Sequence, residues 1–460
     1  MTDEPRSPRE RLEYGRSRRE AAPLESHAEW SADPSRADPV RLIEEQNEDR
    51  VSWLVPVRRA RMSASSFTFY RGSARIMAAD LAQTPVSGIE TQICGDAHLA
   101  NFGNYASPER QLVFDINDFD ETLPGPWEWD VKRLAASFIL AGRFNGLGKM
   151  ESRKLAQQTV RVYRKAMAKL AEMFVTDVWY SLVKADRIRD VAKDDELRAD
   201  LEKFISKTMR KDSRHALRKL AEEVDGKFRL RSDPPLIVPL RDLPDAHDPD
   251  KYREMMLQSF KQYQADMPHH ITHLLSKFRP VDFAFKVVGV GSVGTRCFIL
   301  LLEGRDRSDP LFLQIKEANK SVLEEHLPPS RYRNPGRRVV EGQHLMQTVS
   351  DIFLGYTKGK VTGHDFYLRQ LKDWKGSVNV EDASRDRLKL YARTRGATLA
   401  RAHARSGDPV AIAGYLGTKK TFDRAIAGFA EKYADQAESD YAAFREQIDS
   451  GRLEAAEYGE

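Results

Sequence analysis

The sequence predicts an α+β protein in which a single two-lobed unit accounts for all 460 residues. Apolar residues recur with helical periodicity over residues 130–222 and again after residue 337. Residues 283–316 instead alternate with a period of two and are rich in β-branched residues. Hydrophobic residues make up 41% of the chain, which is enough to bury a substantial core. We therefore expect a β-rich lobe and a helical lobe drawn from the chain on both sides of it.

Composition and charge exclude several classes of protein. The chain has 74 Lys and Arg against 69 Asp and Glu, and its net charge of +5 with interspersed signs argues against a nucleic-acid-binding protein. Cys94 and Cys297 are too few for a disulfide framework or a cysteine zinc module. The first residues lack the apolar core of a secretory signal, and no segment has the ~18 consecutive apolar residues that cross a membrane. We expect a cytoplasmic protein with no nucleic-acid or membrane partner.

Composition divides the chain into five parts. Residues 1–38 are polar and broken by prolines, which predicts a poorly ordered N-terminal arm or a surface wrap. Residues 39–150 combine helices with short strands and polar loops, and residues 151–280 are expected to form a helical insertion ending in a proline-rich connector. Residues 281–376 form the β-rich lobe, and residues 377–460 return to helices, the last of which is amphipathic.

Residues suited to phosphoryl transfer cluster in the second of these parts. Asp96 and Asn101 follow a predicted strand in the run GDAHLAN, and Asp118 follows a second strand. A carboxylate can orient an acceptor hydroxyl and take its proton, while an amide oxygen and a second carboxylate can hold Mg²⁺ against phosphates. Four residues separate Asp96 from Asn101, as in the kinase catalytic loop. We assign Asp96 as the base, and Asn101 and Asp118 as metal ligands.

The acidic run DINDFDE leaves two alternatives open. Asp115 and Asp120 rival Asp118 as the metal ligand, although the period-two strand favours Asp118. A calcium loop of the EF-hand type is excluded, because it needs Gly at position six and Glu at position twelve, where this sequence has Asp120 and Pro126.

Two further groups of polar residues carry weaker signals. Arg61 and Arg71 lie in the run RMSASSFTFYRG, where an arginine could bind phosphate or pair with acids near the site. His269, His270 and His273 have helical spacing but lack the H-E-x-x-H context of a zinc site.

A glycine-rich segment of the β-rich lobe predicts a loop that covers phosphates. Gly289, Gly291 and Gly294 form a G-x-G-x-x-G, with Ser292 inside it, between two strand-like runs. A dinucleotide-binding fingerprint would need a helix directly after the third glycine. The strand-like run that follows therefore favours a kinase-type loop between antiparallel strands.

The segments after this loop continue the same pattern. The strand LFLQIK ends in Lys316, which would contact the α- and β-phosphates. Glu341 lies on the predicted helix RRVVEGQHLMQTV and would fix that lysine by an ion pair. The next strand, FYLRQLKD, predicts a nucleotide-binding hinge at Gln370 and Leu371.

Several of these motifs resemble those of known kinases. GDAHLAN is similar to the GDxHxxN loop of aminoglycoside-phosphotransferase-like kinases, and Asp118-Phe119 resembles their metal-binding Asp. Asp130, in WEWDVKRLA, resembles the family's structural Asp that ties the catalytic loop to the following helix. The sequence departs from the pattern at Cys94, where those kinases usually carry His.

The order of the parts is reversed relative to ordinary kinases, because Asp96 precedes the glycine-rich segment in the chain. Residues 385–404 resemble the helix that leads into the catalytic loop of such kinases. The resemblance therefore implies a protein-kinase-like two-lobed fold that is circularly permuted and carries a large helical insertion. It predicts that His403, near the end of that helix, lies within one loop length of Cys94.

The whole chain also resembles a bacterial family known only as a domain of unknown function and placed among kinase-like proteins. The resemblance is carried by CGDAHLANFG, FDINDFDETLPGPWEWDVKRLAAS, VVGVGSVGTRC and RAHARSGD. It implies a nucleotide site but supplies no substrate. We predict an ATP- and Mg²⁺-dependent phosphotransferase that acts on a hydroxyl of a small molecule. Two alternatives are transfer of AMP on the same site and a nucleotide-binding pseudokinase without catalysis.

Overall fold

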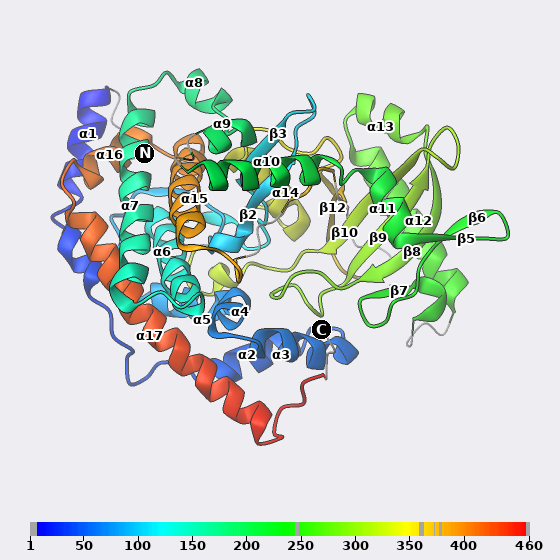
Figure 1. Ribbon diagram of the computed structural model, residues 1–460, viewed down its shortest axis with the longest axis horizontal. Helices are drawn as coiled ribbons and strands as arrows, with labels where there is room; N and C mark the ends of the chain where they lie inside the picture. The colour runs from blue at the N-terminus through cyan, green and yellow to red at the C-terminus, as the bar shows by residue number, and fades with distance from the viewer. Residues whose placement is uncertain are drawn as a thin grey trace.

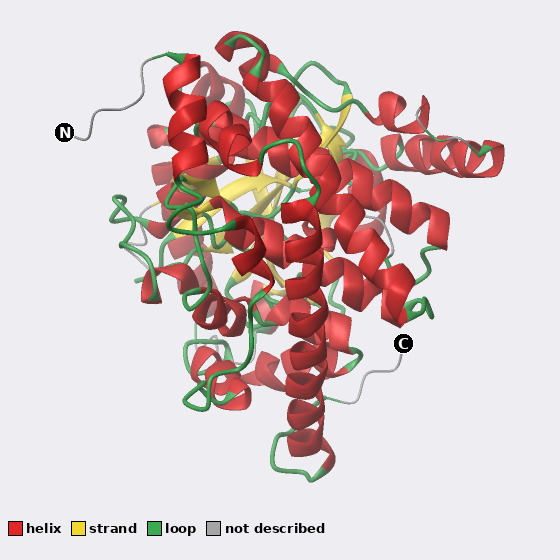
Figure 2. Cartoon of the chain, turned by 90° about the vertical axis from the view of Figure 1, so that its left-hand side faces the viewer, coloured by secondary structure: helices red, strands yellow, loops and turns green. Residues whose placement is uncertain are grey.

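The computed structural model describes residues 7–190, 192, 194–243, 248–357, 363–371, 373–376 and 380–456. The protein has the predicted α+β structure, with a helical part beside a part built on an antiparallel sheet (Figure 1). Helices form the side of the molecule that faces the viewer in Figure 2, and strands lie behind them. Within the described ranges, no helix is both long and apolar enough to cross a membrane.

The helical part contains α6 (Trp127–Phe144), α7 (Lys149–Ala171), α15 (Arg385–Ser406), α16 (Pro409–Leu416) and α17 (Thr421–Asp449). Helix α6 starts directly after Pro126. Its first turn carries Glu128 and Asp130, and the helix dipole stabilises carboxylates at this end of a helix. Trp127 stacks on Tyr163 of α7 with ring centroids 5.6 Å apart. Elements from both halves of the chain therefore share one hydrophobic core.

Residues 7–38 wrap around this core instead of forming the poorly ordered arm that was one of two expectations. The segment contains α1 (Pro8–Ser17) and a 3₁₀ turn (Leu24–Ala28). Arg11 of α1 forms an ion pair with Asp408 at 2.6 Å. Gly414 permits close approach of α16, because a Cβ at that position would lie 2.3 Å from a backbone oxygen of α1. The prolines limit the helices here without preventing packing, so residues 7–38 are not the poorly ordered arm that the composition predicted.

Four short helices follow the wrap and connect the two parts: α2 (Pro39–Asn47), α3 (Val55–Ser63), α4 (Ser66–Gly72) and α5 (Ala74–Leu81). Val57 of α3 belongs to the core beneath the sheet. Phe67 and Tyr70 of α4 belong to the core of the helical part. This segment therefore forms a bridge between the two cores.

Among the described residues, six strands form one antiparallel sheet in the order β11-β12-β10-β9-β8-β7. The strands are β7 (Ile237–Pro239), β8 (Arg279–Lys286), β9 (Cys297–Glu303), β10 (Pro310–Glu317), β11 (Gly355–Thr357) and β12 (Phe366–Gln370). Helix α14 (Pro335–Met346) lies between β10 and β11 in the chain. The predicted hairpin is confirmed as β8–β9, with the glycine-rich segment as its connection. The predicted lysine strand is β10, which pairs with both β9 and β12.

Segments of the predicted insertion cover both faces of this sheet. Helices α12 (Pro249–Asp266) and α13 (His269–Leu275) cover one face. Helix α11 (Ser213–Leu220) and the hairpin of β5 (Ala221–Val224) and β6 (Lys227–Leu230) cover part of the other. The helices α8 (Val175–Tyr180), α9 (Ala185–Asp190) and α10 (Asp195–Met209) precede them.

Two features differ from the predicted division of this region. Helix α7 packs in the helical core and is not part of a separate insertion. The proline-rich residues 228–250 contain β7, the edge strand of the main sheet, as well as connecting chain. An edge strand tolerates Pro239 because one of its sides needs no ladder hydrogen bonds.

Candidate functional site

Two short antiparallel strand pairs place the acidic and amide residues together. Strand β1 (Glu90–Ile93) pairs with β4 (Leu123–Pro126), and β2 (Phe102–Ala106) pairs with β3 (Leu112–Ile116). Because one pair is nested inside the other, loop 94–101 lies beside loop 117–122, and the Asn117 N–H donates to the Asn101 carbonyl at 2.8 Å. Gly95 has φ +79°, and a Cβ there would lie 2.5 Å from the Glu121 carbonyl oxygen. The close approach of the two loops therefore requires glycine.

Asp130 fixes the first of these loops to helix α6. Its carboxylate accepts the N–H groups of Cys94 at 2.8 Å and Gly95 at 3.0 Å, and its own side chain is buried. His403 of α15 contacts the same carboxylate at 3.2 Å. The predicted proximity of His403 and Cys94 is thus confirmed, and Asp130 is the residue that joins them.

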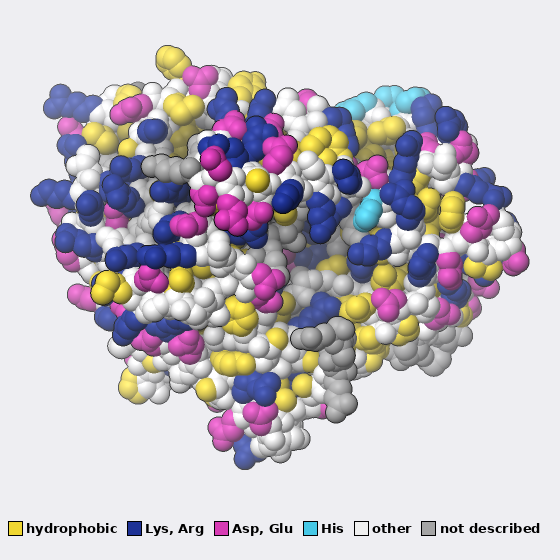
Figure 3. Space-filling model, viewed as in Figure 1, with side chains coloured by type: hydrophobic (Ala, Val, Ile, Leu, Met, Phe, Trp, Pro, Cys, Tyr) yellow, Lys and Arg dark blue, Asp and Glu magenta, His cyan; other side chains and the backbone are white. Residues whose placement is uncertain are grey.

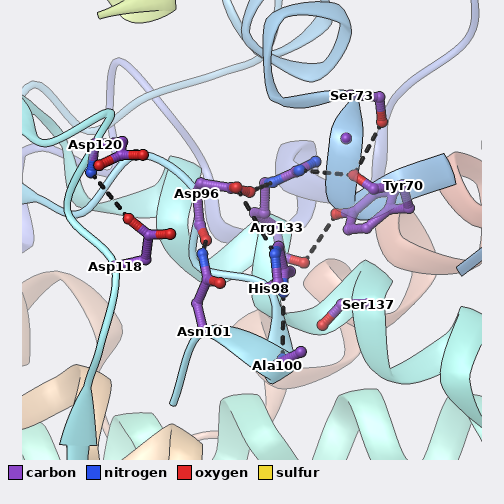
Figure 4. A network of polar contacts seen from close by, with 12 residues as sticks. Tyr70, Ser73, Asp96, His98, Ala100, Asn101, Asp118, Asp120, Arg133 and Ser137 are labelled. Atoms are coloured by element: carbon purple, nitrogen blue, oxygen red, sulfur yellow. Dashed lines mark hydrogen bonds and ion pairs between the residues drawn. The ribbon is translucent and has the colours of Figure 1, made fainter. Parts of the chain in front are cut away.

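Asp96 projects from this loop between Asn101 and Arg133 (Figure 4). Arg133 donates to the Asp96 carboxylate at 2.6 Å, and His98 lies 3.7 Å from its other oxygen. Burial raises the pKa of Asp96 above its ordinary value, although the Arg133 cation acts in the opposite direction. The Asn101 side-chain N–H donates to the Asp96 carbonyl at 2.6 Å, which leaves the amide oxygen of Asn101 as the atom that could accept a metal ion. A carboxylate with a raised pKa is a better proton acceptor.

Lys316 is buried and lies against the second loop. Its ammonium forms an ion pair with Asp120 and lies 3.6 Å from an Asp118 oxygen. Asp120 also accepts hydrogen bonds from Tyr367 at 2.8 Å and Ser292 at 3.3 Å. Burial alone would raise the pKa of Asp120, but Lys316, with help from Tyr367, holds it below its ordinary value. Asp120 is therefore the main partner of the lysine.

The three candidate metal ligands Asp115, Asp118 and Asp120 do not all lie in the same place in the structure. Asp118 and Asp120 line the same cavity as Asp96 and Asn101. Asp115 is buried elsewhere, where it pairs with Arg401 of α15. Within the described ranges, no group of three or more His, Cys, Asp or Glu residues could hold a metal ion by itself. Asn101 and Asp118 still fit Mg²⁺, because this ion needs only one or two protein carboxylates when phosphates and water complete its octahedron.

The glycine-rich segment forms one wall of this cavity, which has a volume of about 750 Å³. Gly289, Gly291 and Ser292 line it. Gly294 does not line it and packs instead on Arg50, with φ +88°. The structure therefore gathers Asp96, Asn101, Asp118, Asp120, Gly289, Gly291 and Ser292 around one space, with Lys316 directly behind the carboxylates.

The predicted ion pair between Lys316 and Glu341 is not present. Glu341 contacts Arg337 at 3.3 Å and lines a different cavity. Helix α14 instead turns Gly342 toward loop 117–122, where a Cβ would lie 2.4 Å from Thr122. Glu341 precedes this glycine by one residue and so points about 100° away around the helix.

Arg338 takes the position on α14 that sequence reasoning had given to the glutamate. It donates to the carbonyl oxygens of Thr122 and Asp120, each at 2.7 Å, and of Asn319 at 2.8 Å. Helix α14 therefore binds the backbone of the acidic loop through Arg338. It does not bind Lys316 through an ion pair. The pattern RRVVEG does not show whether Glu341 or Arg338 faces the acidic loop. That choice depends on how the helix is rotated about its axis.

The predicted hinge also lies away from the cavity. The Gln370 N–H donates to Asp351, and the Leu371 N–H donates to the Phe312 carbonyl at 2.9 Å. The Leu371 side chain packs in the cluster that α11 forms on the sheet. Both backbone donors are thus engaged, and the structure does not join Gln370 and Leu371 to the other predicted site residues.

A comparison with known families supports the bacterial resemblance drawn from the sequence. Residues 50–447 match the family described as "Uncharacterized protein conserved in bacteria (DUF2252)". The chain belongs to DUF2252. Searches of curated proteins and of solved structures found no match to this DUF2252 member.

Among the residues around the cavity that were not singled out in the sequence are Arg133 and Glu121. Arg133, the ion-pair partner of Asp96, lies three residues after Asp130, so its position one turn further along α6 could have indicated it. Glu121 lines the cavity, and burial raises its pKa to about 7. On the face of the molecule in Figure 3, charged side chains of both signs are interspersed, as the near-neutral composition predicted.

Proposed function

We propose that this DUF2252 member is an ATP- and Mg²⁺-dependent phosphotransferase that phosphorylates a hydroxyl of a small molecule. The observation that carries the proposal is the cavity beneath the glycine-rich segment. Asp96, Asn101 and Asp118 line it together, and Lys316 contacts Asp118 from behind. A base, two oxygen ligands for a divalent cation and a buried lysine are the parts that phosphoryl transfer requires.

The topology supports a kinase-like relationship. The sheet part contains a glycine-rich hairpin, a strand with the lysine, a helix and two further strands, in the chain order of protein kinases. The end of α15 lies beside β1, where Ser406 donates to the Gln92 carbonyl at 3.2 Å. Joining these two points would restore the usual order of helix and catalytic loop, so their contact supports a circular permutation.

Each residue has a role that follows from its contacts. Asp96 would accept the proton of the acceptor hydroxyl, and Arg133 and His98 hold its carboxylate in place. Asn101 and Asp118 would hold Mg²⁺, which when bound neutralises charge on the phosphates. Lys316 is held by Asp118 and Asp120 and would contact the phosphates from the sheet. The departures at Glu341, Gln370 and Leu371 suggest that the nucleotide base is bound differently from an ordinary kinase.

Binding of nucleotide tests the proposal first. We expect ATP with Mg²⁺ to raise the melting temperature of the protein, and Asp118→Asn to reduce that shift. Glu341→Gln is the matched control, because Glu341 lies outside the cavity, and it should leave the shift unchanged. Absence of any shift in the wild-type protein would refute a nucleotide site.

Labelled ATP then distinguishes the reactions. The protein is incubated with a mixture of hydroxyl-bearing metabolites and ATP labelled at either the γ- or the α-phosphate. We expect label to appear in a product only from the γ-position, and to be lost in Asp96→Asn. Label from the α-position alone would indicate AMP transfer, and binding without transfer from either position would indicate a pseudokinase.

A further inference from the structure

The cavity has a second wall that the proposed chemistry does not use. It is formed by the segment from α2 to α5, which contributes Arg50, Arg58 and Arg71. Arg50 lies in the connection after α2, Arg58 lies on α3, and Arg71 lies on α4. Three guanidinium groups from three elements therefore border one space together with Asp96.

None of these three arginines forms an ion pair with a carboxylate within the described part of the chain, although acidic residues lie near each of them. The buried Nε of Arg71 has no hydrogen-bond partner in the described part of the chain, and the carboxylates whose charge acts on Arg71 are Glu381 first and then Asp96. Arg58, which is fully buried, donates only to uncharged oxygens: Asn47 at 2.7 Å, the Gly72 carbonyl at 3.2 Å and Gln46 at 3.3 Å. Arg50 donates to the Val293 carbonyl, and its Nε, like that of Arg58, has no partner within the described part of the chain.

Other arginines of the protein show how such charges are usually accommodated. Arg75 borders the same cavity, but it pairs with Glu45 at 3.0 Å and with Glu325 at 2.9 Å. Arg164 is buried in the helical part and binds Asp423 through two hydrogen bonds of 2.8 Å. A buried cation without an anion is costly. An anion bound in the cavity would supply the ion pair that Arg50, Arg58 and Arg71 do not form with any described residue.

The electrostatics agree with the contacts. Burial lowers the pKa of Arg50 to about 10 and also lowers the pKa of Arg58 and Arg71. Arg50 lowers the pKa of Arg58 further, because the two cations repel each other. A bound anion would relieve both the desolvation and the repulsion.

Arg71 lies on the side of the proposed base. Its charge lowers the pKa of both Asp96 and His98, and Glu381, followed by Asp96, in turn favours the charged form of Arg71. Arg50, by contrast, lies near Asp120 and Glu121 and contacts the glycine-rich segment. An anion on Arg71 would therefore lie next to the carboxylate that takes the proton.

We propose that Arg71, with Arg50 and Arg58 beside it, binds an anionic group of the acceptor, so that the substrate is a hydroxyl compound carrying a phosphate or a carboxylate. The guanidinium fork suits both groups, because it can donate two parallel hydrogen bonds. The assignment to the acceptor rests on the proposed function. In that reaction the acceptor hydroxyl gives its proton to Asp96, its oxygen forms a bond to the γ-phosphorus, and the bond to ADP breaks with its electrons on ADP.

The experiment uses inorganic phosphate as a probe of the anion site. Affinity is measured by calorimetry and thermal shift on the full chain, with and without Mg²⁺ and a non-hydrolysable ATP analogue. We expect Arg71→Gln to weaken phosphate binding by about 10- to 100-fold, the effect of losing a charged hydrogen bond. Affinity for the ATP analogue should stay within about twofold, and Arg71→Lys should recover part of the phosphate binding.

Arg75→Gln is the matched control, because this arginine borders the same cavity but is already paired. It should leave phosphate affinity unchanged, and Arg71→Gln should not lower the melting temperature without ligand, because the Arg71 side chain is only partly buried and its Nε has no partner in the described part of the chain. Equal phosphate affinity in wild type and Arg71→Gln would overturn the inference. Competition between phosphate and the ATP analogue would assign Arg71 to the nucleotide and overturn the acceptor assignment. Failure of the analogue to bind would refute the nucleotide site alone, since the phosphate measurement is independent of it.

Discussion

Asp130 offers the sharpest test of how the candidate catalytic loop is held. In Asp130→Ala, the Cys94 and Gly95 N–H groups, at 2.8 and 3.0 Å in the native protein, lose their acceptor. Each buried donor left unpaired costs about 1–3 kcal/mol, so the two together predict a loss of about 4 kcal/mol. Asp130→Asn keeps one acceptor oxygen and should lose about 2 kcal/mol.

The assay is urea denaturation followed by circular dichroism, combined with measurement of ATP affinity. Asp423→Ala is the matched control: it breaks the buried pair with Arg164 and should also destabilise the protein, by about 3–5 kcal/mol. It lies away from the catalytic loop, so it should leave ATP affinity unchanged, whereas Asp130→Ala should weaken it. A double-mutant cycle with His403→Ala should give a coupling of about 0.5–3 kcal/mol. A loss below about 1 kcal/mol in Asp130→Ala would refute the reasoning.

Three further predictions concern the same loops. Gly95→Ala should destabilise the protein by more than about 1 kcal/mol, because φ is +79° and the new Cβ would meet the Glu121 carbonyl; equal urea midpoints would contradict this. Lys316→Met should destabilise the protein by about 1–3 kcal/mol, because it removes the charged hydrogen-bond donor of the partly buried Asp120, whereas Glu341→Gln should be neutral within about 0.5 kcal/mol in the same assay. Glu121→Gln should remove a pH dependence of stability. The folded protein retains the Glu121 proton up to about pH 7, while the unfolded chain releases it near the ordinary value of about 4.3. The wild type should therefore lose about 2–3 kcal/mol relative to the variant as pH rises from about 5 to 8, and parallel pH profiles would contradict the shift.

Patterns of neighbouring residues in the sequence predicted the strands, the hairpin and the loops that these patterns determine. The alternation of residues 283–302 and the glycines between them predicted the β8–β9 hairpin, and LFLQIK predicted β10. The spacing of Asp96, Asn101 and Asp118 predicted residues that share one cavity, because short strands and tight loops allow them few other arrangements. The proximity of His403 to Cys94 was predicted from the order of motifs.

Features that depend on tertiary packing could not be predicted in this way. The rotation of α14 is set by Gly342 against Thr122, and it determines that Arg338 rather than Glu341 faces the acidic loop. Helix α11 comes from a distant segment and packs where the predicted hinge would otherwise be open. A polar, proline-broken sequence predicted little order for residues 7–38, but their order comes from contacts with α16 near the other end of the chain.

The contact between Asp130 and His403 joins residues 273 positions apart, and Arg11 meets Asp408 across 397 positions. During synthesis, the acidic loops emerge from the ribosome long before α15 and α16 do. The nascent chain therefore carries Asp96 and Asp118 on loops whose final support has not yet been made, and contacts of such high sequence separation form late. Any product truncated before residue 403 lacks the histidine that completes the Asp130 cluster. Assembly of the site thus requires that the chain has been synthesised at least as far as the end of α15.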